Sequence, residues 1–326
     1  MRVLVTGADG FVGRSASAEL LSGGHDVLGG VRGAPVLSSR WNERLAAVRW
    51  IPFTMADRTS VERALAMAPD AVLHLAAIAS GAQARANPME AWAVNCLGTC
   101  ELVYALERLS PRTRLIFAST GEVYGRVPER PIEETDLCAP CSPYAASKRA
   151  AEEAILESHR RSGIDVVIAR AFAQTGAGQR DGFVVPALAR RILDAARLGQ
   201  GAVAVGNLEP VREFVDVRDV GAALRLLVER GAPGGIYNVA AGRGVRLSTV
   251  FQRLASLVGW AGRPEPDPAL YRAADIPYLV GSGVRLAALG WQPTYGLDDT
   301  LRDVVDDLRS APATAPAGAH STISAR

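Results

Sequence analysis

The stretch VLVTGADGFVG, residues 3–13, decides the fold of this chain. An aliphatic run ends in three glycines spaced Gly-x-x-Gly-x-x-Gly, and a segment of helical period follows. This order predicts a strand, a tight turn and a helix that starts at the turn. Gly7 permits the turn, Gly10 lets the backbone approach a pyrophosphate, and Gly13 lets the helix pack on the strand. The helix N-terminus then binds phosphate, although glycines also end strands for structural reasons alone.

Beyond this motif, short aliphatic runs alternate with longer segments of helical period. Such alternation predicts βαβ units, and strands that are apolar throughout are covered on both faces. The expected fold class is therefore α/β, a Rossmann-type doubly wound parallel sheet. We expect strands at residues 2–5, 26–31, 48–53, 71–75, 114–118 and 165–169, and helices at 12–21, 59–67, 89–109 and 144–161.

The rhythm breaks after about residue 170, where glycine and proline become more frequent between elements. We expect residues 1–170 to form the nucleotide-binding domain, with returning segments near 211–240. Residues 171–210 and 241–309 then form a smaller C-terminal lobe that binds substrate. Residues 310–326 are poor in bulky apolar groups and predict a disordered tail. The elements expected in this half are a strand at 236–239 and helices at 186–197, 219–229, 248–258 and 297–309.

The charge balance excludes several classes of partner. The chain has 326 residues, and 36 basic side chains nearly cancel 34 acidic ones, for a formal net charge of +2. We therefore expect no nucleic acid and no membrane bound through bulk charge. No apolar run approaches the roughly 20 residues that cross a bilayer, and the first residues lack the layout of a secretory signal. The expected location is the cytoplasm.

Four cysteines are too few for a disulfide framework and predict reduced thiols. Cys96 and Cys100 lie one helical turn apart, and Cys138 and Cys141 form a CxxC. Four such sulfurs can bind zinc. Helix packing and a pair of loop thiols explain them as well, and we expect no metal.

The end of the second expected strand carries information about the nucleotide. NAD sites place a carboxylate about 20 residues after the glycines, where it binds the adenosine ribose, whereas NADP sites place a cation there. Here Arg32 follows the strand and no acid stands at its end. Arg32 therefore favours NADP(H), and NAD(H) remains possible. A solvated arginine at a strand end is the alternative.

A second motif, PYAASK at residues 143–148, places a phenol beside an ammonium. Ser142 is a good N-cap and Pro143 suits the first helical position, so Tyr144 and Lys148 lie one turn apart on one helix face. We expect the ammonium to lower the pKa of the phenol, which makes Tyr144 a usable proton donor near neutral pH. The same pair also occurs by chance on solvated helices.

Together these motifs resemble the extended short-chain dehydrogenase/reductase family, whose members act mostly on nucleotide-activated sugars. The resemblance covers residues 1 to about 309 and implies an NAD(P)-dependent oxidoreductase. Besides TGADGFVG and YAASK, it rests on Asp57, HLAA at 74–77, NP at 87–88, NCLGT at 95–99 and STGEVYG at 119–125.

The resemblance also implies roles for the matching residues. Thr120 binds the reacting oxygen alongside Tyr144, and Lys148 also holds the nicotinamide ribose; Glu122 completes the implied catalytic set. Structural roles remain open for Asp57 as a helix cap, His74 as a paired core histidine and Thr120 as a strand-end hydroxyl. The implied cofactor-binding residues are Gly7, Asp9, Gly10, Phe11, Val12, Gly13, Arg32, Asp57, Arg58, Leu75, Ala76, Ala77, Asn95, Tyr144, Lys148 and Ala171.

The residue after Thr120 bears on the reaction. In the similar 4,6-dehydratases, the catalytic threonine is followed by an Asp-Glu or Ser-Glu pair that eliminates water from the sugar. Here Gly121 has no side chain, although Glu122 alone remains as a base. Ketone reduction needs only hydride, a proton donor and an oxyanion anchor, so the residues favour a reductase. The alternatives are an NAD-dependent nucleotide-sugar 4-epimerase, a 4,6-dehydratase and a non-catalytic NADP-binding regulator.

The second half is similar to the substrate half of GDP-4-keto-6-deoxy-D-mannose reductases, which make GDP-D-rhamnose. The shared segments include GFVVP at 182–186, VGNLE at 205–209 and REFVDVRD at 212–219. In that family two arginines bind the diphosphate, as guanidinium groups do well. Ion pairing of Arg212 with Glu213 or Asp216 is the alternative. The implied substrate-binding residues are Thr120, Gln174, Phe183, Val184, Asn207, Arg212 and Arg272.

One position departs from that family. Ala173 stands where members commonly have an asparagine that bonds the substrate. Losing a hydrogen bond to a charged group costs about 1.5 to 3 kcal/mol unless something replaces it. Either Gln174 compensates or the substrate differs.

Apolar residues on the helices at 89–109 and 144–161 predict a homodimer through a helix bundle, as in similar enzymes. Packing against the chain's own sheet is the alternative. The residues concerned are Trp92, Leu97, Leu102, Ile155 and Leu156.

Overall fold

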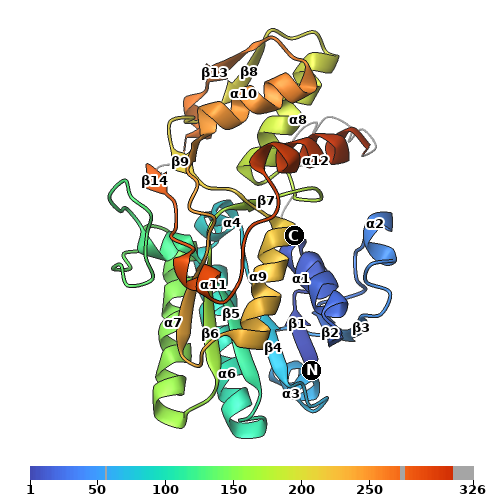
Figure 1. Cartoon of the computed structure of the whole chain (residues 1–326), viewed down its shortest axis with the longest axis vertical. Helices are drawn as coiled ribbons and strands as arrows, with labels where there is room; N and C mark the ends of the chain where they lie inside the picture. Colours follow the sequence, from blue (N-terminus) through green and yellow to red (C-terminus); the bar gives the residue numbers. More distant parts are fainter. Residues whose placement is uncertain (56, 272–275, 311–326) are drawn as a thin grey trace, which may run out of the picture.

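A seven-stranded parallel sheet forms the centre of the molecule, with strands in the order β11-β6-β5-β4-β1-β2-β3 (Figure 1). The structure is a computed structural model that describes residues 1–55, 57–271 and 276–310. The strand order reverses between β1 and β4, the point at which α/β sheets bind ligands. The strands are β1 (Arg2–Thr6), β2 (Asp26–Val31), β3 (Arg49–Pro52), β4 (Ala71–His74), β5 (Arg114–Thr120), β6 (Val166–Ala171) and β11 (Gly235–Val239).

Helices cover both faces of the sheet, because successive side chains of a strand point to opposite sides. Val3 and Val5 belong to the core under α1 (Phe11–Ser22) and α9 (Val217–Arg230). Leu4 belongs to the opposite core, under α3 (Arg58–Leu65), α6 (Gly98–Leu109) and α7 (Pro143–Ser162). The predicted Rossmann-type fold is confirmed, and the predicted strands match those of the sheet to within two residues at each end.

The helix predicted over residues 89–109 is wrong as a single element. It consists of α5 (Pro88–Trp92), a π-helix (Ala93–Leu97) and α6. Hydrophobic periodicity cannot separate one wide turn from an α-helix over five residues, and such π-turns occur mostly at functional sites.

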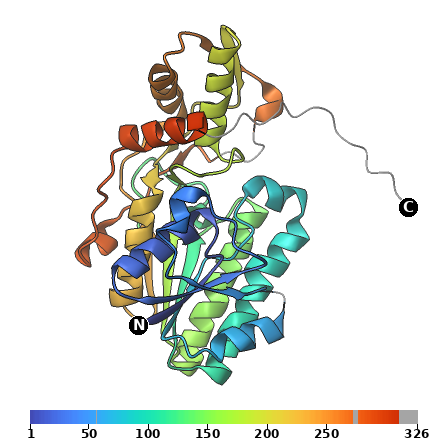
Figure 2. The same cartoon turned by 90° about the vertical axis from the view of Figure 1, so that its right-hand side faces the viewer.

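The second half of the chain adds a lobe beyond the carboxyl ends of the strands (Figures 1 and 2). The helices α8 (Val184–Arg197), α10 (Leu247–Val258) and α12 (Leu297–Ser310) bury their apolar faces in a core of their own. The strand β13 (Arg263–Pro266) pairs with β8 (Ala202–Val205) at its edge.

Several short elements were not predicted, because runs of two to six residues carry little periodic signal. They are α2 (Ser39–Asn42), α4 (Gly81–Ala86), β7 (Gln174–Thr175), β9 (Val211–Arg212), β10 (Val215–Asp216), β12 (Val245–Arg246), β14 (Tyr278–Leu279) and α11 (Val284–Ala288).

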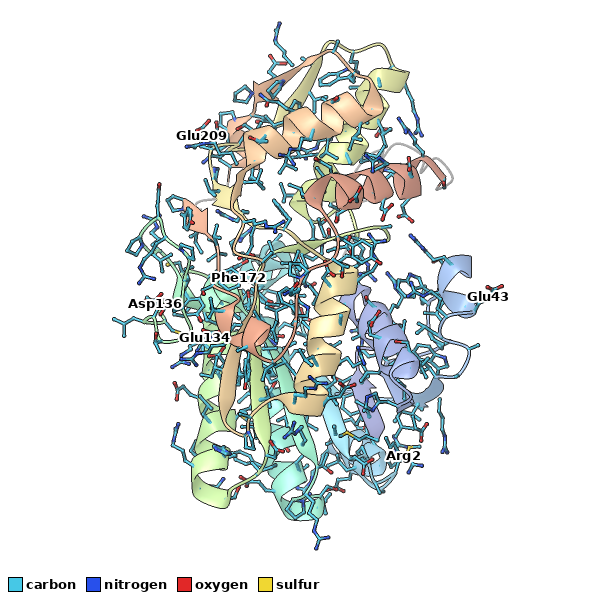
Figure 3. All side chains as sticks on the ribbon, in the orientation of Figure 1. Arg2, Glu43, Glu134, Asp136, Phe172 and Glu209 are labelled. Atoms are coloured by element: carbon cyan, nitrogen blue, oxygen red, sulfur yellow. The ribbon has the colours of Figure 1, made fainter. Side chains whose placement is uncertain are left out.

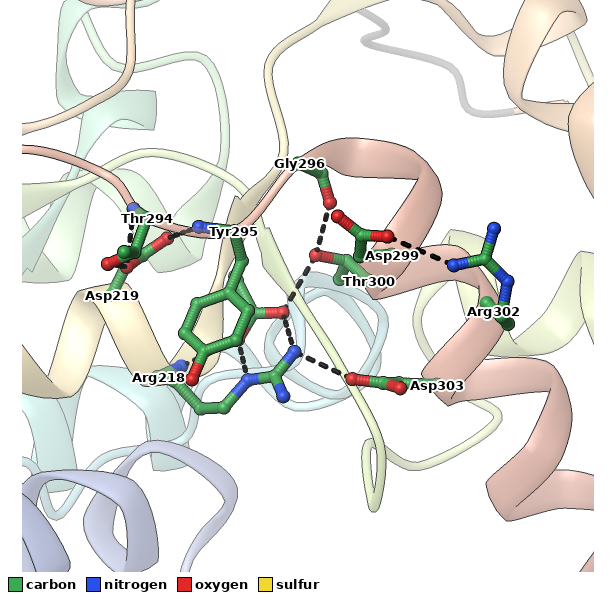
Figure 4. A network of polar contacts seen from close by, with 10 residues as sticks. Arg218, Asp219, Thr294, Tyr295, Gly296, Asp299, Thr300, Arg302 and Asp303 are labelled. Carbon is green, nitrogen blue, oxygen red and sulfur yellow. Dashed lines mark hydrogen bonds and ion pairs between the residues drawn. The ribbon is translucent and has the colours of Figure 1, made fainter.

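The chain returns to the sheet through α9, which packs on α1, and β11, which pairs with β6. A polar network ties the lobe to the start of α9 (Figure 4). Asp219 accepts hydrogen bonds from the N–H and hydroxyl of Thr294 at 2.9 Å each and from the N–H of Tyr295 at 3.1 Å. Arg218 pairs with Asp303 of α12 at 2.7 Å and lies over the Tyr295 ring. The lobe is thus fixed against the sheet at this seam.

None of the helices that the structure describes has the length and apolar character of a membrane span. Ser310 ends α12, and the rest of the predicted tail, residues 311–326, lies outside the described residues.

Candidate active site

The glycine turn after β1 has the geometry of a phosphate-binding turn. Gly7 has a φ of +68°, which favours glycine, and its N–H donates to Gly30 O at 2.8 Å. A Cβ on Gly13 would collide with Gly7 O, so only glycine lets α1 come this close to β1. Gly10, the N-cap of α1, gives the helix no side-chain hydrogen bond, which leaves N–H groups of the first turn for an anion. The turn therefore fits the pyrophosphate of a dinucleotide.

The segment after β4 lies against this turn. A Cβ on Gly7 would lie 3.1 Å from Ala76 N. Thr6 Oγ1 accepts hydrogen bonds from the N–H groups of Leu75 and Ala76 at 3.1 Å each. These contacts hold Leu75, Ala76 and the adjoining Ala77 at the border of the crevice between β1 and β4.

His74 is a paired core histidine, which is the structural role left open for it in the sequence analysis. Its Nδ1 lies 2.7 Å from Thr6 Oγ1, and its Nε2 lies 3.2 Å from Thr99 Oγ1. Burial, with a smaller contribution from the charge of Lys148, lowers the pKa of His74 to about 3. A histidine that stays neutral in this way supports the end of β4 and carries no charge in the site.

Thr120, Tyr144 and Lys148 come together at the carboxyl end of the sheet. Thr120 ends β5, and the other two lie on the first turns of α7, where Ser142 Oγ accepts the N–H of Ala145 at 3.1 Å as the N-cap. The Tyr144 and Thr120 side chains are hydrogen-bonded. Thr120 Oγ1 also accepts the N–H of Glu122 at 3.2 Å. The hydroxyl therefore caps the turn after β5 and also contacts Tyr144.

Burial shifts the pKa values of both Tyr144 and Lys148, and the shift of Tyr144 differs from the one predicted from the sequence. Burial raises the pKa of Tyr144, the charge of Glu122 raises it further, and the hydrogen bond to Thr120 offsets only part of the rise. Burial also lowers the pKa of Lys148 to about 7. The predicted lowering of the Tyr144 pKa is wrong for the protein alone, because desolvation of the phenolate and the charge of Glu122 outweigh the hydrogen bond to Thr120. Tyr144 therefore stays protonated, as a proton donor must.

Lys148 is the only lysine in the sequence. The other positively charged side chains counted in the net charge of the chain are arginines. Its side chain is 3% exposed, and Nζ lies 4.0 Å from the centroid of the Phe117 ring. Arginine keeps its proton wherever it is placed, whereas lysine shifts its pKa readily on burial. The one amine side chain of the protein is thus buried in the site, which indicates chemistry more than surface charge.

Asn95 lies in the π-helix, one layer behind the crevice. Its Oδ1 accepts the N–H of Ile78 at 2.8 Å, and its Nδ2 donates to Ile78 O and Ser147 Oγ at 3.1 Å each. The buried amide therefore joins the loop after β4 to α7 and fixes the position of both walls.

Three residues are predicted to bind the adenosine part of the cofactor, and they differ in their contacts within the chain: Arg32, Asp57 and Arg58. Arg32 follows β2, is exposed, and forms no ion pair within the described part of the chain. Asp57 is the N-cap of α3 and accepts the N–H of Thr59 at 3.0 Å, so its helix-cap explanation is confirmed. Arg58 is exposed and pairs with Glu62 at 3.0 Å on the same helix.

The other predicted cofactor residues line the strand ends. Asp9 lies in the glycine turn, and Phe11 and Val12 begin α1. Ala171, the last residue of β6, is the register partner of Thr120. Ala171 and Thr120 thus lie side by side at the carboxyl end of the sheet, the end that also carries the glycine turn.

The predicted substrate residues lie on the lobe side. Gln174 begins β7, and its Oε1 is buried with no hydrogen-bond partner among the described residues. Phe183 is the partly exposed N-cap of α8, and Val184 is the first residue of that helix. Asn207 lines a cavity of about 200 Å³. Arg272 lies outside the described residues.

Arg212 lies on β9 and donates to Val211 O at 2.9 Å. The alternative ion pairs with its neighbours are wrong, because both carboxylates have other partners. Glu213 is fully buried, accepts the backbone N–H groups of residues 241, 242 and 281, and has its pKa raised to about 7 by burial. Asp216 holds Arg218 at 2.7 Å.

Gly121, beside Thr120, has no room for a side chain. A Cβ there would lie 2.9 Å from the ring of Phe172, and one on Gly281 would collide with the same ring. Phe172 is buried where the sheet meets the lobe (Figure 3). The structure therefore excludes an acid at position 121 unless Phe172 moves.

Sequence reasoning missed Glu152 and Arg170, which form a buried ion pair at 2.7 Å directly behind the site. A signal was present, because Tyr144, Lys148 and Glu152 are spaced four residues apart and share one helix face.

The four cysteines are all free thiols. Cys96 and Cys100 hydrogen-bond to each other, and burial raises the pKa of Cys100 to about 11. In the described ranges, no group of three or more histidine, cysteine or acidic side chains is arranged to hold a metal ion.

Two of the predicted dimer-seam residues are wrong. Leu102 and Ile155 are completely buried under the chain's own sheet. Trp92 and Leu97 are exposed, whereas Leu156 packs against the core and is only partly buried.

Comparison with known proteins gives consistent matches. Residues 3–240 match the NAD dependent epimerase/dehydratase family. A GDP-6-deoxy-D-mannose reductase from Pseudomonas aeruginosa is 33% identical over 318 residues, which are 95% of this chain and 97% of that protein. The solved structure of RMD from Pseudomonas aeruginosa with NADPH is 31% identical, with a TM-score of 0.81 over 95% of this chain and 99% of that one. The Thermus thermophilus UDP-glucose 4-epimerase with NAD is 33% identical, with a TM-score of 0.85 over 96% and 100% of the two chains.

Proposed function

This chain belongs to the NAD dependent epimerase/dehydratase family, and we propose that it is an NADPH-dependent reductase of a nucleotide-linked 4-keto-6-deoxy-hexose. The proposed reaction converts GDP-4-keto-6-deoxy-D-mannose to GDP-D-rhamnose. The observation that carries the proposal is the set of buried Thr120, partly buried Tyr144 and buried Lys148 at the end of the sheet that carries a phosphate-binding turn, with no side chain at position 121. A GDP-6-deoxy-D-mannose reductase among the relatives supports the substrate class.

In the proposed mechanism, NADPH supplies the hydride that adds to C4 of the ketone. Tyr144 donates its phenolic proton to the oxygen of C4, so the ketone becomes an alcohol and the phenol becomes a phenolate. The Thr120 hydroxyl, hydrogen-bonded to Tyr144, orients this proton and the substrate oxygen. The Lys148 ammonium stabilises the phenolate until a proton from solvent restores it. The glycine turn and Arg32 would hold the pyrophosphate and the 2′-phosphate of the cofactor.

The packing of Phe172 against Gly121 supports reduction over elimination of water. A dehydratase of the similar kind has an aspartate or serine side chain at the position of Gly121, and the Phe172 ring fills that volume. Glu122 remains, but alone it supplies a base without the acid that elimination also requires.

The unpartnered Gln174 Oε1 supports this residue as the replacement for the missing asparagine side chain at Ala173. A buried carbonyl oxygen without a partner costs free energy unless a ligand donates to it. A sugar hydroxyl provides such a donor.

The test is oxidation of NADPH, followed by its absorbance, when purified protein is mixed with GDP-4-keto-6-deoxy-D-mannose. We expect turnover with NADPH and formation of a GDP-6-deoxy-hexose that mass spectrometry finds heavier than the ketone by the mass of two hydrogens. No turnover with this ketone or with its dTDP and UDP counterparts would contradict the reductase.

A 4-epimerase is the second candidate, since the similar Thermus thermophilus epimerase was solved with NAD. An epimerase returns the hydride that it removes, so the purified protein would retain NAD. Release of bound nucleotide by denaturation separates the two: retained NAD supports the epimerase, and an empty site that prefers NADPH supports the reductase.

Arg32→Gln is expected to weaken NADPH binding by about 10- to 100-fold, because a 2′-phosphate loses a charged hydrogen-bond donor. NADH binding should change little, since NADH has no phosphate there. Fluorescence titration with both nucleotides measures this difference. Arg302→Gln, which removes an exposed arginine paired with Asp299 on α12, is the control. Equal loss for both nucleotides would contradict the role of Arg32.

We also propose a homodimer through α5, the π-helix and α6. Five large apolar side chains on these elements are exposed: Met89, Trp92, Leu97, Tyr104 and Leu109. A second copy of the same face would cover them, as closed two-fold pairs commonly do.

A further inference from the structure

Lys148 has few partners for a buried ammonium. The described side chains give its Nζ no hydrogen bond, and its one close contact is the face of Phe117 at 4.0 Å. A buried amine in this situation loses its proton easily, since burial disfavours the charged form. Something else must therefore supply the negative charge that keeps it an ammonium.

Glu152 is placed to supply this charge. It lies one helical turn after Lys148 on α7 and is completely buried. Arg170 of β6 donates to both of its oxygens, at 3.0 and 2.7 Å, and Ser119 of β5 donates to Oε1 at 2.5 Å. Arg149 donates to Oε2 at 2.8 Å. Four hydrogen bonds thus fix the position of the carboxylate.

The other groups around Lys148 cannot replace Glu152. His74 of β4 is neutral, and Tyr144 of α7 is a protonated phenol. Arg149 and Arg170 are cations and cannot balance an ammonium. The charge of Glu122, two residues after Thr120, raises the pKa of Tyr144. The charge that raises the pKa of Lys148 is that of Glu152. Cys138, in the loop that faces Glu152 and Arg170, is a protonated thiol whose pKa burial raises.

We propose that Glu152 is a positioning residue that acts through Lys148: its fixed carboxylate balances the Lys148 ammonium and keeps the single lysine of the chain charged. The inference rests on the proposed function in one respect, namely that a charged Lys148 stabilises the Tyr144 phenolate and holds the cofactor ribose. Arg170, Arg149 and Ser119 then serve to hold Glu152 rather than to contact substrate.

The single lysine permits a direct test without turnover. Protein labelled with ¹³C-lysine gives one side-chain signal, and its chemical shift against pH reports the protonation of Lys148 alone. In the wild type we expect a midpoint near 7. Glu152→Gln should lower the midpoint by about one pH unit or more, because a buried charge one turn away is removed.

Glu153→Gln is the matched control. Glu153 is the next residue on α7 and pairs with the same Arg149, but its side chain is exposed. The substitution removes an equal charge from the surface, where water screens it, and the Lys148 midpoint should not move.

A second readout is the pH profile of kcat/KM for ketone reduction. Activity that needs the Lys148 ammonium falls on the alkaline side, and in Glu152→Gln this fall should move to lower pH by the same amount as the NMR midpoint. A residue with a purely structural role would lower the rate at every pH and leave the profile in place.

Glu152→Gln leaves Arg170 without its partner and can prevent folding. The double variant Glu152→Gln with Arg170→Met removes both charges and keeps the test available. It should fold and should still titrate Lys148 below the wild-type midpoint, because the charge of Glu152, which raises the pKa of Lys148, is removed.

An unchanged Lys148 midpoint in the folded single or double variant would overturn the proposal. A lowered midpoint in a protein that reduces no sugar-nucleotide ketone would support the Glu152 inference and count against the reductase. The two proposals therefore fail separately.

Discussion

Tyr144→Phe is expected to lower the rate of the proposed ketone reduction by about 10²- to 10⁴-fold, the usual contribution of a positioned proton donor, and to leave NADPH affinity unchanged. The phenyl ring fills the same buried space, so the fold and the cofactor crevice are kept. The variant lacks the phenolic proton that the developing alkoxide needs. Thr120 cannot supply this proton, because its hydroxyl has then lost its hydrogen bond to Tyr144. Single-turnover kinetics with saturating NADPH measures the effect on the chemical step.

Tyr104→Phe provides the control for this substitution. Tyr104 lies on α6 with its side chain largely exposed, and the change removes the same hydroxyl group from the surface. Its activity should equal that of the wild type. If Tyr144→Phe also kept the wild-type rate, another group would have to be the proton donor and the mechanism above would be wrong.

Arg170→Met is expected to lower the free energy of unfolding by about 3 to 5 kcal/mol. Arg170 is 2% exposed and donates two hydrogen bonds to the completely buried Glu152. It also donates to the Tyr124 hydroxyl at 2.9 Å. Without it, a buried carboxylate keeps only Ser119 and Arg149. Urea denaturation followed by circular dichroism measures the loss.

Two further variants test whether the loss of stability in Arg170→Met comes from its ion pair with Glu152. Arg149→Met removes the partly exposed cation that binds the same carboxylate and should cost about 1 kcal/mol or less. Arg170→Met combined with Glu152→Gln should be more stable than Arg170→Met alone, because the double variant no longer buries a carboxylate that has lost its arginine partner. An Arg170→Met protein as stable as Arg149→Met would show that the pair does not carry the stability assigned to it.

Much of the fold follows from local sequence. Glycine spacing and aliphatic runs predicted the sheet, because strands covered on both faces have a strong apolar signal and Gly13 is required by its close approach to Gly7. The two-residue strands of the lobe carry no such signal, since their pairing depends on segments such as 211–212 and 278–279 that are far apart in sequence. The π-helix was missed because its register depends on tertiary contacts of Asn95.

The sequence predicted that Tyr144 and Lys148 lie together, but it did not predict their electrostatics. The direction of the Tyr144 pKa shift depends on burial, which the four-residue spacing does not reveal. For the same reason Leu102 and Ile155 were assigned to a dimer seam, although α6 and α7 turn these side chains toward the sheet. Glu152 lies in the same helical pattern, but its importance depends on Arg170, eighteen residues later on another element.

The contact between Gly121 and Phe172 also constrains how this enzyme can change during evolution. An acidic residue at position 121 collides with the aromatic ring, and a smaller residue at position 172 alone leaves a void between two glycines. Each change is harmful by itself, so acquiring elimination chemistry requires both together. Such epistasis separates the two activities in sequence space even where their backbones superimpose.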